Sequence, residues 1–184
     1  MGTNVSFPRG LWPIRNQVGG EIRMTEYPAG GTIYQGDLVK LSGGLVVVAA
    51  AGDEQLLGVA LNYTTATPTQ AGNYDPYMPT VPGTTAGTVL VADDPKTVFG
   101  IELSQTNGGV FAANDIGEMA DIIAGSGNTL THLSGYVLDA NTLGGDLVTA
   151  AQLRVLSLIT TPDNFYGDKA KIEVIIVEHL FNAV

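Results

Sequence analysis

Residues 32–61 read TIYQGDLVKLSGGLVVVAAAGDEQLLGVAL, and this stretch decides the fold. Runs of Val, Leu and Ile alternate in it with Gly, Asp and Ser, which is the pattern of short β-strands separated by turns. The segment 42–44 (Ser-Gly-Gly) divides two such runs, and glycine accepts the positive φ that a tight hairpin turn requires. We therefore expect an antiparallel hairpin of residues 37–41 and 45–50, followed by a third strand over 55–63.

The same pattern covers the rest of the chain from residue 21 onward. Further strands are predicted at residues 21–27, 32–34, 87–92, 97–103, 118–124, 135–138, 152–161 and 171–180, and the last two are expected to pair antiparallel. No segment longer than about ten residues keeps the 3.6-residue period of a helix, so only short helices at 112–115 and 147–151 are expected. This many short strands with glycine turns predicts an all-β barrel or sandwich.

Two segments depart from the strand pattern. Residues 1–20 contain two prolines, four glycines and the only tryptophan of the chain, without a helical or strand period. They predict an extended N-terminal arm in front of a body formed by residues 21–184. Residues 66–85 hold four of the nine prolines, and they predict a long loop. Its two tyrosines, Tyr74 and Tyr77, are predicted to contact a neighbouring subunit.

The composition excludes several classes of protein. Charged residues make up 14% of the chain and the net charge is −10, whereas an average soluble domain has roughly 25% charged residues. Such a surface is expected to meet other protein. Eight basic residues are too few for a nucleic-acid partner, and the absence of cysteine excludes disulfides and thiolate metal sites. The longest apolar run, residues 45–51, is too short to span a membrane, so we expect a soluble protein made in the cytoplasm.

The residues that could carry chemistry favour structural roles. Neither His132 nor His179 has a recognisable nucleophile or carboxylate partner, and both are interpreted as structural. Asp93 and Asp94 precede a proline and could bind a hard cation or form a carboxylate dyad, but a turn between strands is favoured. Residues 139–146 begin like a calcium loop and lack its bidentate glutamate. We therefore expect no catalytic site, no cofactor and no metal, and the chain is not expected to be an enzyme.

The N-terminal arm is the most informative segment for partners. It contains Phe7, Arg9, Leu11, Trp12 and Arg15, and aromatic residues and arginine are enriched at binding hot spots. The arm is basic, whereas the rest of the chain is strongly acidic. These five residues are predicted to anchor on another protein. The alternative, that the arm folds back and plugs its own barrel, stays open.

Three blocks carry a resemblance to a known class of protein. They are residues 32–61 quoted above, residues 89–103 (VLVADDPKTVFGIEL) and residues 153–179 (LRVLSLITTPDNFYGDKAKIEVIIVEH). In this order they resemble the small virion structural proteins of tailed bacteriophages, which decorate or cement the capsid. The resemblance implies an antiparallel β-barrel or β-tulip-like body on the exterior of the capsid, synthesised in the host cytoplasm. It also implies a homotrimer that touches several copies of the major capsid protein, and no catalytic residue is carried over.

Two other functions remain as alternatives. A tail or receptor-binding component of the virion would recognise a host surface, and Tyr74, Tyr77, Phe165 and Tyr166 would then be its contact aromatics. The other alternative is a β-barrel hydrolase or nucleotide-processing trimer. Its candidate carboxylates would be Asp93, Asp94, Asp139 and Asp146.

Overall fold

The computed structural model describes residues 3–65, 74–75, 77–78, 87–104, 110–143 and 151–182. These residues form short strands joined by turns, and the one helix among them is a single 3₁₀ turn, η3 (Ala113–Asp115), where a short helix is predicted. The predicted all-β fold is confirmed, and every pairing between named strands is antiparallel. The other predicted helix, at 147–151, falls outside the described residues except for its last position.

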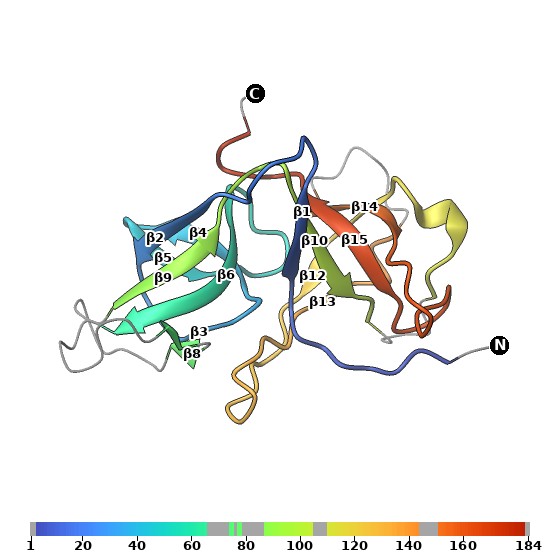
Figure 1. Cartoon of the computed structure of the whole chain (residues 1–184), viewed down its shortest axis with the longest axis horizontal. Coiled ribbons are helices and arrows are strands. Elements are labelled where there is room, and N and C mark those ends of the chain that lie inside the picture. The colour runs from blue at the N-terminus through green and yellow to red at the C-terminus, as the bar shows by residue number, and fades with distance from the viewer. Residues whose placement is uncertain are drawn as a thin grey trace.

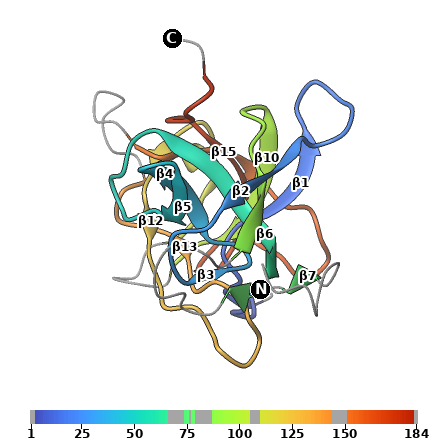
Figure 2. The same cartoon turned by 90° about the vertical axis from the view of Figure 1, so that its left-hand side faces the viewer.

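Two larger sheets lie side by side and make up the body (Figure 1). The first has the order β2-β9-β6-β4-β5, with β7 paired to β6, and it faces the viewer in Figure 2. Its strands are β2 (Met24–Pro28), β4 (Leu38–Ser42), β5 (Leu45–Val48), β6 (Leu56–Thr65), β7 (Tyr74–Asp75) and β9 (Gly87–Ala92).

The second sheet has the order β1-β10-β15-β14-β11. Its strands are β1 (Trp12–Asn16), β10 (Thr97–Glu102), β11 (Met119–Ala120), β14 (Leu153–Leu158) and β15 (Lys171–Ile176). Two small pairs complete the fold, β3 (Ile33–Tyr34) with β8 (Tyr77–Met78) and β12 (Ile122–Ile123) with β13 (Val137–Leu138).

Local turn chemistry explains the pairings that the sequence predicts. Ser42 pairs with Leu45 across the β4–β5 turn, and Gly43 and Gly44 adopt φ values of 58° and 82°. Both values are those of a two-residue hairpin turn that glycine favours. The predicted antiparallel pair of β14 and β15 is also confirmed.

Residues 11–16 differ from the prediction of an arm separate from the body. They belong to the body, because β1 pairs with β10 and Leu11 is 2% exposed in the main core. The ring of Trp12 lies against Gly100, where an added Cβ would stand 2.2 Å from Trp12 Cε2. Because Gly100 has no side chain, the Trp12 ring packs directly against its backbone. Pro13 interrupts the strand pattern in the sequence, and an edge strand tolerates it because one side needs no ladder hydrogen bonds.

The predicted long loop at 66–85 contains two short strands. Within it, β7 pairs with β6 and β8 pairs with β3. The rest of this segment lies outside the described residues, as do the side chains of Tyr74 and Tyr77.

Strand β6 contributes to two cores. Leu56 and Val59 pack into the cluster that joins both sheets, whereas Leu57 and Ala60 pack into a second cluster with residues of β4, β5 and β9. A strand buried on both faces needs a continuous apolar run, which is what residues 56–61 provide. The two sheets therefore share one core, and the first sheet has another on its opposite face.

Two buried titratable groups lie near strand ends: Asp37 directly precedes β4, and His179 follows β15. Burial raises the pKa of Asp37 to about 6, although its carboxylate accepts a hydrogen bond from the Tyr34 amide at 2.7 Å. Burial lowers the pKa of His179 to about 4. The Nδ1 atom of His179 accepts a hydrogen bond from the Phe181 amide, while Nε2 has no partner among the described residues. A neutral imidazole suits this environment because a proton on Nδ1 would displace that bond.

Gly58 is a position where any side chain should destabilise the fold. Its φ is 151°, and an added Cβ would lie 2.1 Å from the Ala92 carbonyl oxygen. Because that contact is with backbone, we expect Gly58→Ala to lower the free energy of unfolding by about 2–3 kcal/mol. Gly31→Ala is the control, since nothing lies within 4 Å of its added Cβ. Urea unfolding measures both, and equal stabilities of the two variants would contradict this packing.

Asp37 and His179 should act oppositely on stability as the pH falls. His179 binds a proton more weakly in the folded state, with a pKa of about 4 instead of 6.5, so acidification below pH 6.5 destabilises the protein. Asp37 binds a proton more tightly when folded, at about 6 instead of 3.8, so acidification below pH 6 stabilises it. We expect Asp37→Asn to lose about 2 kcal/mol more stability than the parent chain between neutral pH and pH 4. If the free energy of unfolding changes with pH in the same way in both proteins, the raised pKa is not that of Asp37.

Candidate contact surface on the N-terminal arm

Asn4 ties the start of the arm to the connection between β14 and β15. Its Nδ2 donates to the carbonyl oxygens of Phe165 and Asp168 at 2.8 and 2.7 Å, and its Oδ1 accepts from the Phe165 amide at 2.8 Å. The Asn4 side chain is buried and uses both ends of its amide group on backbone atoms. These hydrogen bonds connect the N-terminal segment to Phe165 and Asp168, which lie far away in the sequence.

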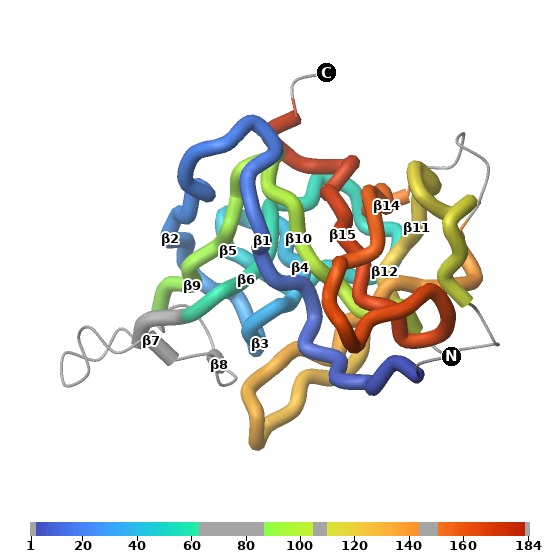
Figure 3. The backbone as a smooth tube through the Cα atoms, turned by 45° about the vertical axis from the view of Figure 1, so that its right-hand side comes forward, coloured from blue at the N-terminus to red at the C-terminus, as the bar shows by residue number. Residues whose placement is uncertain are grey.

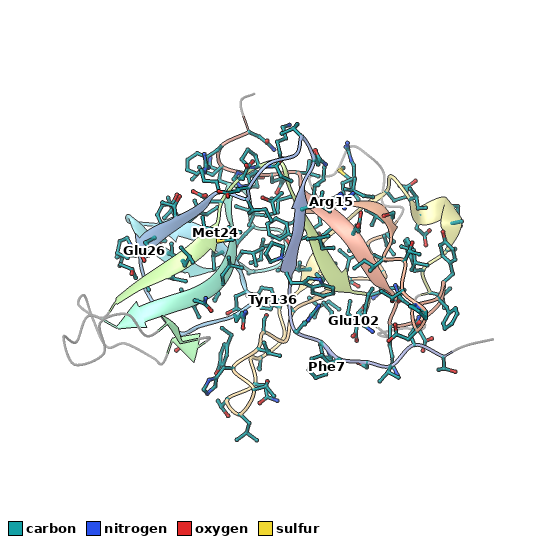
Figure 4. The ribbon with its side chains drawn as sticks, in the orientation of Figure 1. Phe7, Arg15, Met24, Glu26, Glu102 and Tyr136 are labelled. Carbon is teal, nitrogen blue, oxygen red and sulfur yellow. The ribbon has the colours of Figure 1, made fainter. Side chains whose placement is uncertain are left out.

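Glu102 holds the next part of the arm. Its two carboxylate oxygens accept hydrogen bonds from the Ser6 hydroxyl and the Phe7 amide, each at 2.7 Å. Phe7 and Glu102 lie close together in the side-chain view (Figure 4). Farther along, the Leu11 amide donates to the Gly36 carbonyl at 2.8 Å. The arm therefore runs along the body, with its inner side occupied by hydrogen bonds.

The outer side of the arm presents aromatic and cationic groups. Phe7 is 56% exposed, and the Arg9 guanidinium carbon lies 3.9 Å from the centre of the Trp12 ring. Together with residues of β15 and its neighbouring turn they border an open cleft of about 440 Å³, which we name the arm cleft. Its lining residues are Phe7, Arg9, Trp12, Ile159, Thr161, Asp163 and Lys171.

The lining of the arm cleft carries two cations and one carboxylate, within an acidic protein. Arg9 and Lys171 are two of only eight basic residues, and in the described part of the chain neither is in an ion pair. Partial burial lowers the pKa of Arg9, but a guanidinium stays charged at any pH that the protein tolerates. The Thr161 hydroxyl and, less strongly, Lys171 hold the pKa of Asp163 below its usual range. With Asp163 ionised, Arg9 and Lys171 leave an excess of one positive charge next to the apolar Phe7 and Trp12 side chains.

The five arm residues predicted to bind a partner lie in three different environments. Phe7, Arg9 and Trp12 lie together at the arm cleft. Leu11 is in the core, which agrees with the alternative in which part of the arm folds back on its own body. Arg15 forms an ion pair with Glu173 at 2.7 Å. Three of the five residues thus remain at one accessible surface.

Several residues of this surface were not found by sequence reasoning. Asn4, Glu102 and Lys171 carry no motif, and the contact between Asn4 and Phe165 spans 161 positions of the chain. Phe165 and Tyr166, considered only for a receptor-binding protein, lie in the turn that Asn4 holds. The ring of Tyr166 stacks on Phe111 with 5.5 Å between centroids.

Asp94 caps the turn between β9 and β10, as the favoured interpretation predicted, whereas the Asp93 carboxylate forms an ion pair with Arg23. The buried Asp93 accepts hydrogen bonds from Arg23 Nε at 2.9 Å and from the Tyr27 hydroxyl at 2.6 Å. Asp94 accepts from the Lys96 amide at 2.8 Å, and its carbonyl oxygen accepts from the Thr97 amide at 3.0 Å. Across the described ranges, no three His, Asp or Glu side chains are grouped so that they could hold a metal ion.

No protein-family model and no curated protein matches the sequence. Within the described residues, no helix has the length and apolar character needed to cross a membrane.

Asn4→Ala tests whether these hydrogen bonds hold the arm. The substitution leaves the Phe165 amide and two carbonyl oxygens without their partner, and each lost bond costs about 1 kcal/mol. We expect hydrogen exchange at the Phe165 amide to accelerate by about 10- to 100-fold, with faster proteolysis within residues 1–10. Asn141→Ala, which removes an amide from a local turn at Asp139, is the control. Unchanged exchange at Phe165 in Asn4→Ala would contradict the arrangement.

Proposed function

We propose that this chain is a structural virion protein that binds the outside of a bacteriophage capsid and cements neighbouring major capsid subunits. The observation that carries the proposal is the arm cleft, where Phe7 and Arg9 are exposed and the Arg9 guanidinium lies over the Trp12 ring. The order of sequence blocks that resembles capsid decoration proteins supports the same function. The homotrimeric state and the position on the capsid exterior belong to this proposal.

Preorganisation of the arm favours binding. Asn4 and Glu102 fix its backbone before any partner arrives. A partner therefore does not have to order a loose segment, and that ordering normally subtracts from the affinity. An exposed phenylalanine beside an arginine stacked on tryptophan combines the residue types that dominate interface energies. The positive cleft favours an acidic, partly apolar segment of the major capsid protein as its occupant.

The body of the protein suits a position on the outer surface. A chain with a net charge of −10 is repelled by packaged DNA, which disfavours the capsid interior. For the body we propose a β-barrel formed by the first sheet, because Ala29 bridges to Val46 and the Gly30 amide donates to the Val46 carbonyl at 2.8 Å. These contacts bring the ends of β2 and β5 together around the second core.

Cementing requires only moderate affinity at each contact. A protein that bridges two subunits makes its second contact at a high effective concentration, so several weak contacts together hold firmly. A trimer would carry three arm clefts, one on each subunit. The shell would then be reinforced because each copy bridges neighbouring capsid subunits through several contacts, and no single contact has to be tight.

Binding to purified DNA-free phage heads tests the proposal. We expect Phe7→Ala to weaken binding by more than tenfold, since truncation of an aromatic anchor costs about 2–4 kcal/mol. Arg9→Ala should weaken binding mainly at low salt, because part of its contribution is screened charge attraction. Arg15→Ala removes the same charge from a residue already paired with Glu173, and it serves as the matched control. The heads are incubated with each full-length variant, and the bound fraction is measured after sedimentation.

Three outcomes are distinguishable in this experiment. Loss of binding in Phe7→Ala with normal binding in Arg15→Ala supports the arm cleft as the capsid contact. Equal binding of all variants contradicts that role of the cleft. Failure of the parent chain to bind heads, combined with binding to host cells, would replace the proposal with the receptor-binding alternative.

A further inference from the structure

The connection between β12 and β13 projects away from both sheets (Figures 1 and 3). It comprises residues 124–136, which we name the projecting loop. Near its tip Leu130 is 91% exposed, the highest value among the exposed large hydrophobic residues of the described chain. An exposed leucine is unremarkable on a flat surface, but here it stands at the end of a protrusion that can reach another molecule.

Hydrogen bonds within the loop give its tip a defined shape. Asn128 Oδ1 accepts from the amides of Leu130 and Thr131 at 2.8 and 3.1 Å. The Asn128 carbonyl oxygen accepts from the His132 amide at 2.7 Å, and the Asn128 amide donates to the Leu133 carbonyl at 2.9 Å. Asn128 thus organises the turn that carries Leu130.

The base of the loop is held by close packing at glycine. An added Cβ at Gly127 would stand 2.1 Å from the ring of Tyr34, and one at Gly125 would stand 2.1 Å from the Gly135 carbonyl oxygen. The Ser134 amide also donates to the Gln35 carbonyl at 2.8 Å. The loop is therefore anchored beside β3, and Leu130 is presented on a supported projection.

The absence of charged residues in the projecting loop favours contact with another copy of this acidic protein. Residues 122–138 contain no Asp, Glu, Lys or Arg, although the whole chain has a net charge of −10. Two copies of an acidic protein repel each other, and like charges placed directly at a contact add to that cost. A protruding surface without charge lets two copies touch while their acidic surfaces stay apart.

We propose that the projecting loop is a self-association contact, in which the Leu130 side chains of neighbouring copies pack together around a symmetry axis. Closed oligomers bring equivalent residues together at their axis, which suits a convex tip with one large apolar side chain. Contact removes apolar surface of Leu130 from water in every copy, which favours association. This inference rests on the oligomeric state in the proposed function and assigns its contact.

Sedimentation of the full-length chain in solution, without heads, tests the contact. We expect Leu130→Asp to raise the concentration needed for self-association by at least tenfold, because it replaces the apolar contact with repelling carboxylates. Val18→Asp is the matched control, since Val18 is 79% exposed in the β1–β2 turn at the other end of the molecule. Circular dichroism and the urea midpoint verify that both variants fold like the parent.

A disulfide probe gives a second, direct measurement. The chain has no cysteine, so Leu130→Cys introduces a single thiol. Under mild oxidation we expect rapid formation of covalent dimers by Leu130→Cys and slow formation by Val18→Cys. Equal rates would overturn the contact.

The outcomes separate this inference from the proposed function. A parent chain that self-associates equally with Leu130→Asp overturns the contact but leaves capsid binding through the arm cleft intact. A parent chain that stays monomeric at all concentrations also overturns it, while head binding is still decided by Phe7→Ala. If Leu130→Asp loses head binding with unchanged self-association, the loop docks on the shell and the inference is wrong.

Discussion

Burial of β6 on both faces is the constraint on which the structure depends. Leu56 and Val59 point to one core, and Leu57 and Ala60 point to another, so neither side of residues 56–61 faces water. One face packs in the core shared with the second sheet, and the other packs with residues of β4, β5 and β9. Gly58 allows the strand to pass close to Ala92, where any side chain would collide with the backbone. The arrangement of both sheets follows from this double burial.

The second sheet in turn determines what the arm presents. Once Leu11 is buried and β1 pairs with β10, the preceding residues must run along the outside of the body. Glu102 accepts a hydrogen bond from the Phe7 amide of that segment, and the buried Asn4 side chain bonds the backbone of Phe165 and Asp168, as buried polar groups require partners. The outer side chains, among them Phe7, are left for solvent or for a partner. A segment that helps to complete the fold therefore also provides the candidate contact.

Charge distribution connects the fold to assembly. Most of the chain is acidic, yet the arm cleft places Arg9 and Lys171 together and the projecting loop carries no charge. A positive cleft favours an acidic neighbour, whereas an uncharged tip favours a like molecule. The two surfaces would then have different partners, one on the shell and one on another copy. That division of contacts is what a bridging protein requires.

The sequence by itself determined the all-β class, the hairpin at Gly43 and Gly44 and the pairing of β14 with β15, because turn chemistry and strand period act over a few residues. Only the tertiary structure decided that Leu11 belongs to the core and that Asn4 meets Phe165. Those contacts join segments as much as 161 positions apart, and they depend on strand order and on complementary shapes, such as Gly100 beneath Trp12. Local patterns do not encode which distant surfaces meet, since that outcome is selected by packing of the whole chain.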